Sequence, residues 1–362
     1  MRILFALAGL HRVHRGAEIA FLSVASELAR AGETVTLIGS GPTLENQPYH
    51  YISAGVVPRE RFERFPHFPM LRTETAWEEA TFVPGLLRAY RPRDFDLTVT
   101  CGFPFTNLAL RRPVLGGKRP AHIFVTQNGD WPAVAQNSEY RLFDCDGLVC
   151  INPDYEARNK DRYRTALIPN GTDLERFHPG AAERQRFGFA PDRRIILMVS
   201  APIASKNVDE GVRAVAKLEN ADLVVAGDGP LREEIKALAD EIMPGRYRQI
   251  TVSSGEMPSL YRSVDAFLHL SRDESFGNVY VEALATGLPI VAYDLPRTRW
   301  ILGDEAFYAG NDTNEVAARL SEALTSADGV ESRVKRAQRY GWPAIALQYR
   351  DFFNEVLTNG HR

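Results

Sequence analysis

The feature that most constrains the fold is a repeated alternation of short apolar runs with amphipathic helical segments. Five runs in the first half have the length and composition of buried strands: Arg2–Ala8, Thr34–Gly39, Leu97–Cys101, His122–Thr126 and Gly147–Ile151. Between the first two lies a helical stretch, ending at Gly32, whose apolar residues recur at i, i+3 and i+4: Ala17, Ala20, Phe21, Val24, Ala25 and Leu28. Such alternation is typical of βαβ units, because parallel strands need a crossover helix between them. The pattern predicts an α/β fold.

The same plan restarts in the second half of the chain. Its expected strands are Arg194–Val199, Ala221–Val225, Gln249–Val252, Asp265–Leu270 and Pro289–Tyr293. Between residues 178 and 193 the composition shifts to Gly, Pro and charge, which is typical of a domain boundary. A length of 362 residues also fits two domains. We predict two doubly wound domains, 1–180 and 181–342, with ligands in an interdomain cleft at the carboxyl ends of their strands.

The stretch from Val57 to Asp96 lacks a sustained hydrophobic period and is rich in Arg, Phe and Pro. It is best interpreted as an irregular connection with one or two surface helices. The alternative is an acceptor-facing insertion that interleaves aromatic and arginine side chains. Acidic residues dilute its positive charge, so the first interpretation is favoured.

Composition narrows the class of protein. The 43 basic and 46 acidic residues give a net charge of −3, which offers no basic stripe for nucleic acid. Residues 1–180 hold 21 Lys and Arg against 20 Asp and Glu, compatible with a membrane surface or an anionic acceptor. Three cysteines without a CxxC pair indicate reduced thiols. Met1–Ala8 is too short for a signal peptide, and no apolar run could span a bilayer. We expect a cytoplasmic enzyme, and a peripheral membrane contact stays open.

The segment from Ser271 to Pro289 carries the strongest chemical pattern. A strand ends near Leu270, a loop with Gly277 follows, and a helix is predicted from Asn278 to Thr286. The backbone N–H groups at its start, those of Phe276, Gly277, Asn278 and Val279, suit a pyrophosphate. Glu274 precedes the helix and can face a sugar, whereas Glu282 lies inside it and can reach a pair of ribose hydroxyls. A lone pair of glutamates at this spacing is more often simply solvated.

The surrounding sequence argues against that simpler interpretation. The segment resembles the E-x7-E motif of the GT-B glycosyltransferases, specifically family 4. Ile168–Pro179 resembles the interdomain signature of that family, Ala226–Pro230 its GDGP turn, and Leu260–Leu268 its "LY..AD.FL" segment. The closing Tyr340-Gly-Trp342 resembles the start of its tail, so a C-terminal helix over about 343–362 is expected to pack on the N-terminal domain. Ordered matches along most of the chain make the resemblance specific.

The resemblance implies a GT-B fold of two Rossmann-like domains and a retaining glycosyltransferase that needs neither metal nor cofactor. A nucleoside diphosphate-sugar, favoured to be a UDP-sugar, would bind the C-terminal domain as a substrate. The acceptor, a saccharide, a lipid-linked molecule or a small molecule, would bind the N-terminal domain. Lys206 matches the family lysine that reaches the phosphates, and Met257 matches a position whose backbone contacts the base. Gly16 would let a helix N-terminus approach the donor or acceptor.

Several positions depart from the family pattern. Ala201 stands where the family usually has a second cationic residue that binds the phosphates. Arg15 stands where a first glycine is common. Arg15 is either the replacement cation or a solvated loop residue. In place of a catalytic-site histidine the chain has Gln127 or Asn128, which can hydrogen-bond an acceptor but transfer no proton. Asp130 is the nearest ionisable group, a hypothetical base or acceptor-orienting residue. The loop after Tyr293 also differs, which leaves the sugar open.

Two other functions remain compatible with the sequence. One is another enzyme on the same scaffold, such as a nucleotide-sugar epimerase or a phosphorylase. The other is a sugar-nucleotide-binding protein that has lost catalysis, suggested by Ala201 and by the missing histidine. A dinucleotide-dependent dehydrogenase is disfavoured because neither half has a G-x-G-x-x-G motif after its first strand.

Overall fold

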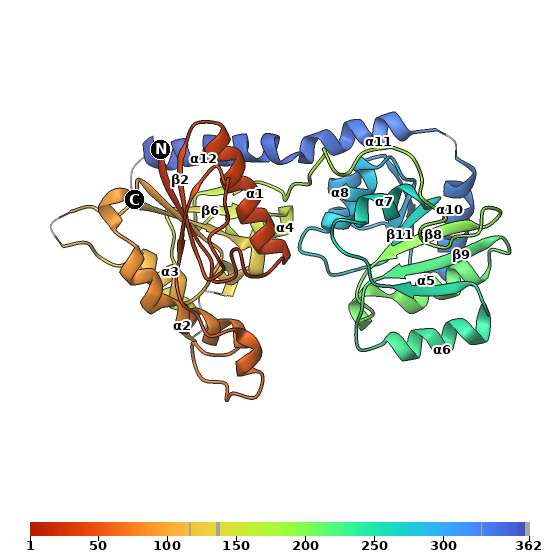
Figure 1. The fold of residues 1–362 in the computed structure, drawn as a ribbon, viewed down its shortest axis with the longest axis horizontal. Helices are drawn as coiled ribbons and strands as arrows, with labels where there is room; N and C mark the ends of the chain where they lie inside the picture. The colour runs from red at the N-terminus through yellow and green to blue at the C-terminus, as the bar shows by residue number, and fades with distance from the viewer. Residues whose placement is uncertain (116, 135–137, 327, 359–362) are drawn as a thin grey trace. The chain divides into compact units, whose positions relative to one another are not determined.

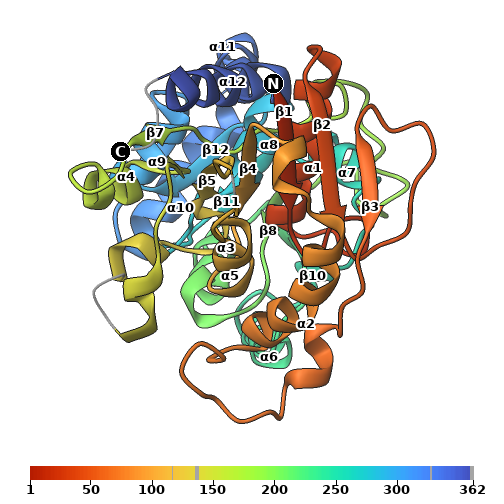
Figure 2. The same ribbon diagram turned by 90° about the vertical axis from the view of Figure 1, so that its left-hand side faces the viewer.

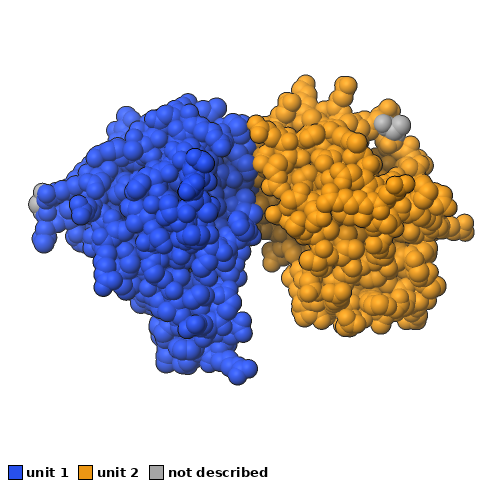
Figure 3. All heavy atoms as spheres, in the orientation of Figure 1, with its two compact units in different colours: residues 1–170, 342–362 blue, residues 171–341 orange. Residues whose placement is uncertain are grey.

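The computed structural model describes residues 1–115, 117–134, 138–326 and 328–358. The chain forms two compact units, coloured separately in Figure 3. Unit 1 contains Met1–Asn170 together with Trp342–Arg362, and unit 2 contains Gly171–Gly341. The division therefore falls ten residues before the boundary expected at 180. The chain leaves unit 1 directly after β7, and the Gly- and Pro-rich stretch around 178–193 lies within unit 2.

Unit 1 is built on a seven-stranded sheet in the order β3-β2-β1-β4-β5-β6-β7, whose adjacent strands all pair in parallel (Figure 1). The central strands were expected from the sequence. The strands are β1 (Arg2–Ala6), β2 (Thr34–Gly39), β3 (His50–Ser53), β4 (Leu97–Thr100), β5 (Ala121–Val125), β6 (Gly147–Cys150) and β7 (Thr165–Leu167). The strand order reverses between β1 and β4, so the loops that follow these strands diverge at that point.

Helices cover both faces of this sheet because alternate residues of each strand point to opposite sides. Phe5 of β1 packs edge to face on Phe21 of α1, while Leu4 packs with Phe82 of α2 in a separate core. The C-terminal helix packs against α1, as the sequence predicts (Figure 1). The helices are α1 (Gly16–Arg30), α2 (Glu74–Ala89), α3 (Phe105–Leu110), α4 (Pro153–Asn159) and α12 (Trp342–Thr358).

The stretch from Val57 to Asp96 has the irregular form predicted for it. It contains two short 3-10 helices, Arg59–Phe62 and Pro92–Asp94, and the surface helix α2. The loop before α2 projects from unit 1 in both ribbon views (Figures 1 and 2). Phe62, Phe65 and Phe68 of this loop all pack against Trp77 of α2, so the loop is anchored by aromatic contacts.

Unit 2 repeats the architecture with a six-stranded parallel sheet in the order β10-β9-β8-β11-β12-β13. The strand order reverses between β8 and β11, which makes their carboxyl ends the expected ligand-binding point of this sheet. The strands are β8 (Arg194–Val199), β9 (Ala221–Ala226), β10 (Tyr247–Ile250), β11 (Ala266–His269), β12 (Ile290–Tyr293) and β13 (Ala306–Ala309). Together the two sheets confirm the predicted α/β class.

The two faces of the unit 2 sheet carry different cores. Leu268 of β11 belongs to the core formed with α5, α6 and α10. Its neighbour Phe267 points to the other face, against Tyr261 of α7 and Tyr280 of α8. The helices are α5 (Val208–Ala216), α6 (Arg232–Ile242), α7 (Met257–Arg262), α8 (Asn278–Ala285), α9 (Pro296–Leu302), α10 (Thr313–Thr325) and α11 (Val330–Ala337).

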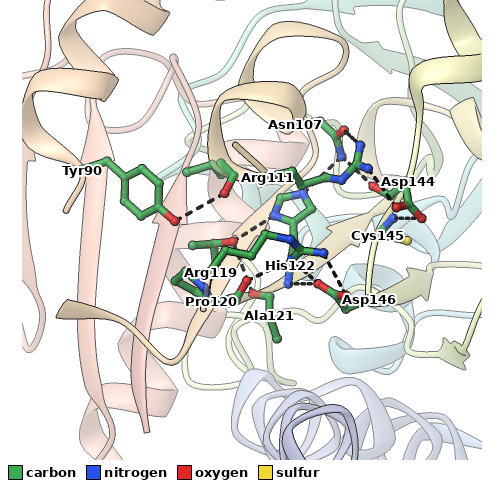
Figure 4. Close-up of polar contacts among 12 residues, drawn as sticks. Tyr90, Asn107, Arg111, Arg119, Pro120, Ala121, His122, Asp144, Cys145 and Asp146 are labelled. Atoms are coloured by element: carbon green, nitrogen blue, oxygen red, sulfur yellow. Dashed lines mark hydrogen bonds and ion pairs between the residues drawn. The ribbon is translucent and has the colours of Figure 1, made fainter. Parts of the chain in front are cut away.

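A buried polar network ties together the amino end of β5 in unit 1 (Figure 4). His122 is fully buried, and burial lowers the pKa of its imidazole to about 3. Both ring nitrogens have partners, Thr98 Oγ1 at 2.9 Å and Asn107 Nδ2 at 3.1 Å. The neutral ring is thus satisfied on both sides, as expected of a structural histidine. Within the described part of the chain, no helix is long and apolar enough to cross a membrane.

Candidate functional site

The strongest group of predicted residues lies at the reversal point of the unit 2 sheet. Lys206 ends a 3-10 helix (Ala204–Lys206) that follows β8, and Glu274 lies in the loop that follows β11. Because these parallel strands are neighbours, their following loops meet at one edge of the sheet. The Nζ of Lys206 donates a hydrogen bond to Oε1 of Glu274, forming an ion pair whose two side chains are only about one-fifth exposed.

Glu274 is held by a second donor that the sequence analysis did not identify. Nε2 of His269, the last residue of β11, lies 2.9 Å from the same Oε1 atom. Burial by itself raises the pKa of Glu274, but the hydrogen bonds from His269 and Lys206 and the positive charge of Lys206 outweigh it and lower that pKa to about 2. Within the described part of the chain, no residue donates a hydrogen bond to Oε2. The carboxylate is therefore ionised and offers one oxygen to a ligand.

The predicted helix start is present immediately after Glu274. Gly277 caps α8 with φ of +87°, in the left-handed region that favours glycine, and a Cβ there would come within 2.7 Å of Tyr280. Phe276 is buried against Trp300 and Tyr340, so its side chain anchors the loop and only its backbone is left to contact a ligand. Asn278 and Val279 form the first turn of α8. Its N–H groups and the helix dipole make this edge favourable for an anion.

Glu282 lies one turn further along α8 and is also oriented by a neighbour. The hydroxyl of Tyr261, a fully buried residue of α7, donates a 2.9 Å hydrogen bond to Oε2 of Glu282. Burial raises the pKa of Glu282, while this hydrogen bond and the charge of Arg176 act in the opposite direction. No donor to its Oε1 atom occurs among the residues that the structure covers, so this glutamate too has one oxygen left for a ligand.

Met257 begins α7 at the carboxyl end of the neighbouring part of the sheet. The loop before it is fixed by Arg176, whose Nη2 donates a 2.6 Å hydrogen bond to the carbonyl of Ser254. Ser253 hydroxyl also donates to Glu256 at 2.8 Å. The backbone at Met257 is therefore well defined, as a position that contacts a flat base would require.

Unit 2 offers another cationic side chain that could bind phosphate in place of the one missing at Ala201. Arg272 is exposed, two residues before Glu274, and its guanidinium lies 5.0 Å from the ring centroid of Tyr293 at the end of β12. This cation–π contact keeps a positive charge at the carboxyl edge of the sheet. Arg272 lies inside the Ser271–Pro289 segment, which was the available sequence signal.

The predicted acceptor residues lie at the carboxyl end of β5 in unit 1, in the 3-10 helix Thr126–Asn128. Gln127 and Asn170 exchange hydrogen bonds through their amides, one of them 3.1 Å long from Asn170 Nδ2 to Gln127 Oε1. Asn128 is exposed, and its Nδ2 lies 3.4 Å from Sγ of Cys101. The amide of Asn128 is therefore the more available of the two for a ligand.

The carboxylate of Asp130 is engaged by its neighbours, whereas a general base needs a carboxylate oxygen that is free to accept a proton. Arg158 Nε donates to its Oδ2 atom at 2.7 Å, and Asn159 Nδ2 donates to its Oδ1 atom at 2.7 Å. Both carboxylate oxygens already accept hydrogen bonds, one of them from a cation. This arrangement ties the loop after β5 to α4.

Arg15 and Gly16 lie in unit 1, at the start of α1. Nη2 of Arg15 is 3.1 Å from Oε1 of Glu60, in a partly solvent-exposed ion pair. Such pairs are weak and exchange readily, so Glu60 leaves Arg15 able to bind another anion. A Cβ added at Gly16 would meet no atom within 4 Å, so the space beside the helix start is open.

Comparison with known proteins indicates the class of protein to which this chain is similar. Residues 181–359 match the family model described as glycosyl transferases group 1. The chain is 26% identical over 368 residues to the D-inositol 3-phosphate glycosyltransferase of Mycolicibacterium smegmatis, covering 90% of this chain and 83% of that protein. Its fold is similar to that of sucrose-phosphate synthase from Thermosynechococcus elongatus, with a TM-score of 0.77, 20% identity and coverage of 99% and 100%. The chain is a glycosyltransferase with the GT-B fold.

The fold of this glycosyltransferase is also similar to that of Anabaena Alr3699/HepE, solved in complex with UDP and glucose. The TM-score is 0.70 at 16% identity, over 98% of this chain and all of that one. In the glycosyltransferase described here, the structure brings Lys206 to Glu274 and places the start of α8 beside them. His269, Tyr261 and Arg272 are neighbours that sequence reasoning missed. His269 and Tyr261 contact the two motif glutamates through the fold, whereas Arg272 contacts Tyr293, and no periodic pattern marks any of them.

Proposed function

We propose that this glycosyltransferase transfers a sugar from a nucleoside diphosphate-sugar to a hydroxyl group with retention of anomeric configuration, as in family 4. The observation that carries the proposal is the ion pair of Lys206 with Glu274 immediately before α8. It joins a cation for phosphate, a carboxylate for the sugar and a helix N-terminus in one place. We favour a UDP-sugar as donor, which is supported by the similarity to a protein solved with UDP and glucose.

Within this proposal the diphosphate occupies the start of α8. Lys206 has three N–H donors, of which one is engaged by Glu274, so the others can reach phosphate oxygens. The first-turn N–H groups of α8 add further donors. As the bond between the anomeric carbon and the diphosphate breaks, negative charge grows on the leaving oxygen, and these groups stabilise it. The backbone from Phe276 to Val279 therefore belongs to the donor site.

The two glutamates have separate roles in the proposed donor site. Glu274 accepts a hydrogen bond from a sugar hydroxyl through Oε2, and Glu282 accepts one from the ribose through Oε1. Met257 supplies backbone contacts to the base. The anomeric carbon passes through an oxocarbenium-like state, a new carbon–oxygen bond forms to the acceptor, and the acceptor proton leaves with the released nucleoside diphosphate. The positive charge that magnesium would otherwise supply comes from Lys206 and α8, so we propose a metal-independent reaction without a cofactor.

We propose that the carboxyl edge of the unit 1 sheet binds the acceptor, through Asn128 and Gln127, with Gly16 giving open backbone at the start of α1. The acceptor class comprises saccharides, lipid-linked molecules and small polyols, the last supported by the relative named for D-inositol 3-phosphate. Arg15 is a candidate cation for an anionic group. Asp130 is left out of the proton chemistry because both of its oxygens are already engaged. The three free cysteines suit a reducing cytoplasm, where we place the reaction.

A panel of UDP-, GDP- and ADP-sugars tests the donor assignment. A true donor raises the unfolding temperature, because it binds the native state selectively. The stabilising donor is then incubated with a mixture of saccharide and polyol acceptors, and the products are resolved by mass. Transfer with retained configuration supports the proposal. A changed sugar epimer without acceptor indicates an epimerase, and stabilisation without any turnover indicates a binding protein.

A further inference from the structure

His269 is a polar residue in an aromatic setting. Its side chain is 2% exposed, with its ring stacked parallel to Phe267 at 6.0 Å between centroids and edge to face with Tyr280 at 4.9 Å. An apolar side chain would fill this place without the desolvation cost that an imidazole carries. A polar contact should therefore account for the imidazole at the last position of β11.

The imidazole of His269 makes this polar contact with Glu274. Nε2 of His269 lies 2.9 Å from Oε1 of Glu274, whereas Nδ1 is buried and has no hydrogen-bond partner among the described residues. A proton on Nδ1 would be a buried donor without an acceptor, which is costly. An ionised carboxylate only accepts hydrogen bonds, so Nε2 carries a proton and donates a hydrogen bond to Glu274.

His269 and Lys206 converge on one oxygen of Glu274 with different rigidity. The lysine ammonium sits on a flexible four-carbon stem and is also needed at the phosphates. The imidazole is short, planar and fixed between two aromatic rings. Of the two donors, His269 is therefore the one that can define the direction of the carboxylate while Lys206 shifts toward a ligand.

Another buried histidine, His122, provides a contrast. His122 has partners at both nitrogens, Thr98 and Asn107, at the amino end of β5 (Figure 4). It lies at the edge of the unit 1 sheet opposite to the loops that carry the candidate acceptor residues. Its contacts account for it as a part of the core. His269 differs because the one hydrogen bond of its ring to a described residue is with Glu274 of the proposed donor site.

We propose that His269 is a positioning residue for Glu274, donating from Nε2 so that the carboxylate directs Oε2 at the donor sugar. The inference rests on the proposed function of Glu274. It assigns a role in the chemical step and none in holding the nucleotide, whose ribose and phosphates are bound by other groups.

Two substitutions separate this role from packing. His269→Phe keeps an aromatic ring between Phe267 and Tyr280 but removes the donor. His269→Gln removes the ring but can place an N–H near the position of Nε2. If His269 positions Glu274, the Phe variant has a kcat about 10- to 100-fold below wild type, as expected for a misplaced reacting group, and the Gln variant recovers most of that loss. UDP affinity, measured by calorimetry, stays within about twofold in both, because the groups proposed to hold the ribose and the phosphates do not include His269.

Release of UDP from the donor that stabilises the wild-type enzyme most is the kinetic readout. His122→Phe is the control, and it should lower the unfolding temperature without changing the kcat of the folded protein. A higher kcat in His269→Phe than in His269→Gln would assign His269 to packing and overturn the inference. Equal kcat in wild type and both variants would also overturn it. Failure of the proposed function is a distinct result, namely wild-type protein that neither binds UDP nor releases it from any sugar nucleotide.

Discussion

The hydroxyl of Tyr261 donates a 2.9 Å hydrogen bond to Oε2 of Glu282, just as His269 contacts Oε1 of Glu274 at 2.9 Å. In each case a buried ring fixes one oxygen of a motif glutamate and leaves the other without a donor from the described residues. The two supporting residues come from different elements, α7 and β11. The motif therefore depends on neighbours that set the directions of its carboxylates.

Replacing Tyr261 with Phe should weaken nucleotide binding. The substitution removes a buried hydrogen bond to a charged group, which contributes about 1.5–3 kcal/mol, so Glu282 loses its fixed orientation toward the ribose. We expect the Kd for UDP to rise roughly tenfold, measured by titration calorimetry, since 1.4 kcal/mol corresponds to a factor of ten. The kcat at saturating donor should change much less.

Tyr90→Phe is the matched control for this prediction. Tyr90 is also buried, and its hydroxyl donates to the carbonyl of Leu110 at 3.3 Å in unit 1 (Figure 4). Its removal should lower stability without affecting UDP affinity. Equal Kd values for wild type and Tyr261→Phe would show that Glu282 does not need this hydrogen bond.

The local features of the proposed donor site could be predicted from sequence because they are encoded by neighbouring residues. Gly277 before an apolar helical repeat indicates a helix start after a strand, and the structure begins α8 at Asn278 as predicted. Glu274 and Glu282 followed from the same segment. Lys206 was assigned through the family resemblance, and its contact with Glu274 depends on β8 and β11 lying side by side.

The parts that were missed depend on contacts between distant segments. His269 lies within the run Asp265–Leu270, which indicates a buried strand, and nothing in this run distinguishes a core histidine from one that faces a carboxylate. Tyr261 lies in the segment Leu260–Leu268, but its partner is 21 residues away on α8. The strands β3, β7 and β13 were also not predicted. They are three or four residues long and lie at or near sheet edges, so their apolar pattern is too short to detect.

Lys206→Gln should slow the chemical step strongly. The change keeps a hydrogen-bond donor of similar reach but removes the charge that would stabilise the departing diphosphate. Loss of one such electrostatic contact costs about 10²–10³ in kcat. Single-turnover UDP release is the measurement. Lys236→Gln is the control, because Lys236 forms an exposed ion pair with Asp240 on α6 and should not affect kcat. Unchanged kcat in Lys206→Gln would remove this lysine from the mechanism.

The ion pair of Glu274 should produce an acid-sensitive stability difference. The folded pKa of about 2 lies below the ordinary value of 4.5, so the ionised carboxylate stabilises the fold above pH 4.5 and that contribution is lost as pH falls toward 2. Between pH 7 and pH 3.5 the stability advantage of wild type over Glu274→Gln should shrink by roughly 1.5 kcal/mol. Urea unfolding at both pH values measures it. A gap that stays constant with pH would contradict the lowered pKa.

The contribution of Glu79 to stability should have the opposite pH dependence to that of Glu274. It is a buried residue of α2, and its Oε2 accepts a 3.3 Å hydrogen bond from the backbone of Thr106, yet no cation pairs with it among the described residues. A Cβ added at Gly102 would come within 2.8 Å of its Oε1, so the carboxyl is closely packed as well. Burial raises the pKa of Glu79 to about 7, while the surrounding backbone N–H groups oppose that shift.

The direction in which stability changes with pH follows from the folded pKa of about 7 and the ordinary value of 4.5. Below pH 4.5 the carboxyl is protonated in both folded and unfolded chains, and its contribution to stability is fully present. As pH rises from 4.5 to 7 the unfolded chain ionises first, so that contribution is lost, by about 3 kcal/mol in total. Glu79→Gln cannot ionise, so its stability relative to wild type should increase by about this amount between pH 4.5 and pH 8. The exposed Glu45→Gln is the control, for which urea unfolding should give the same difference at both pH values. If Glu79→Gln behaves like this control, the neutral state of Glu79 is not what the fold stabilises.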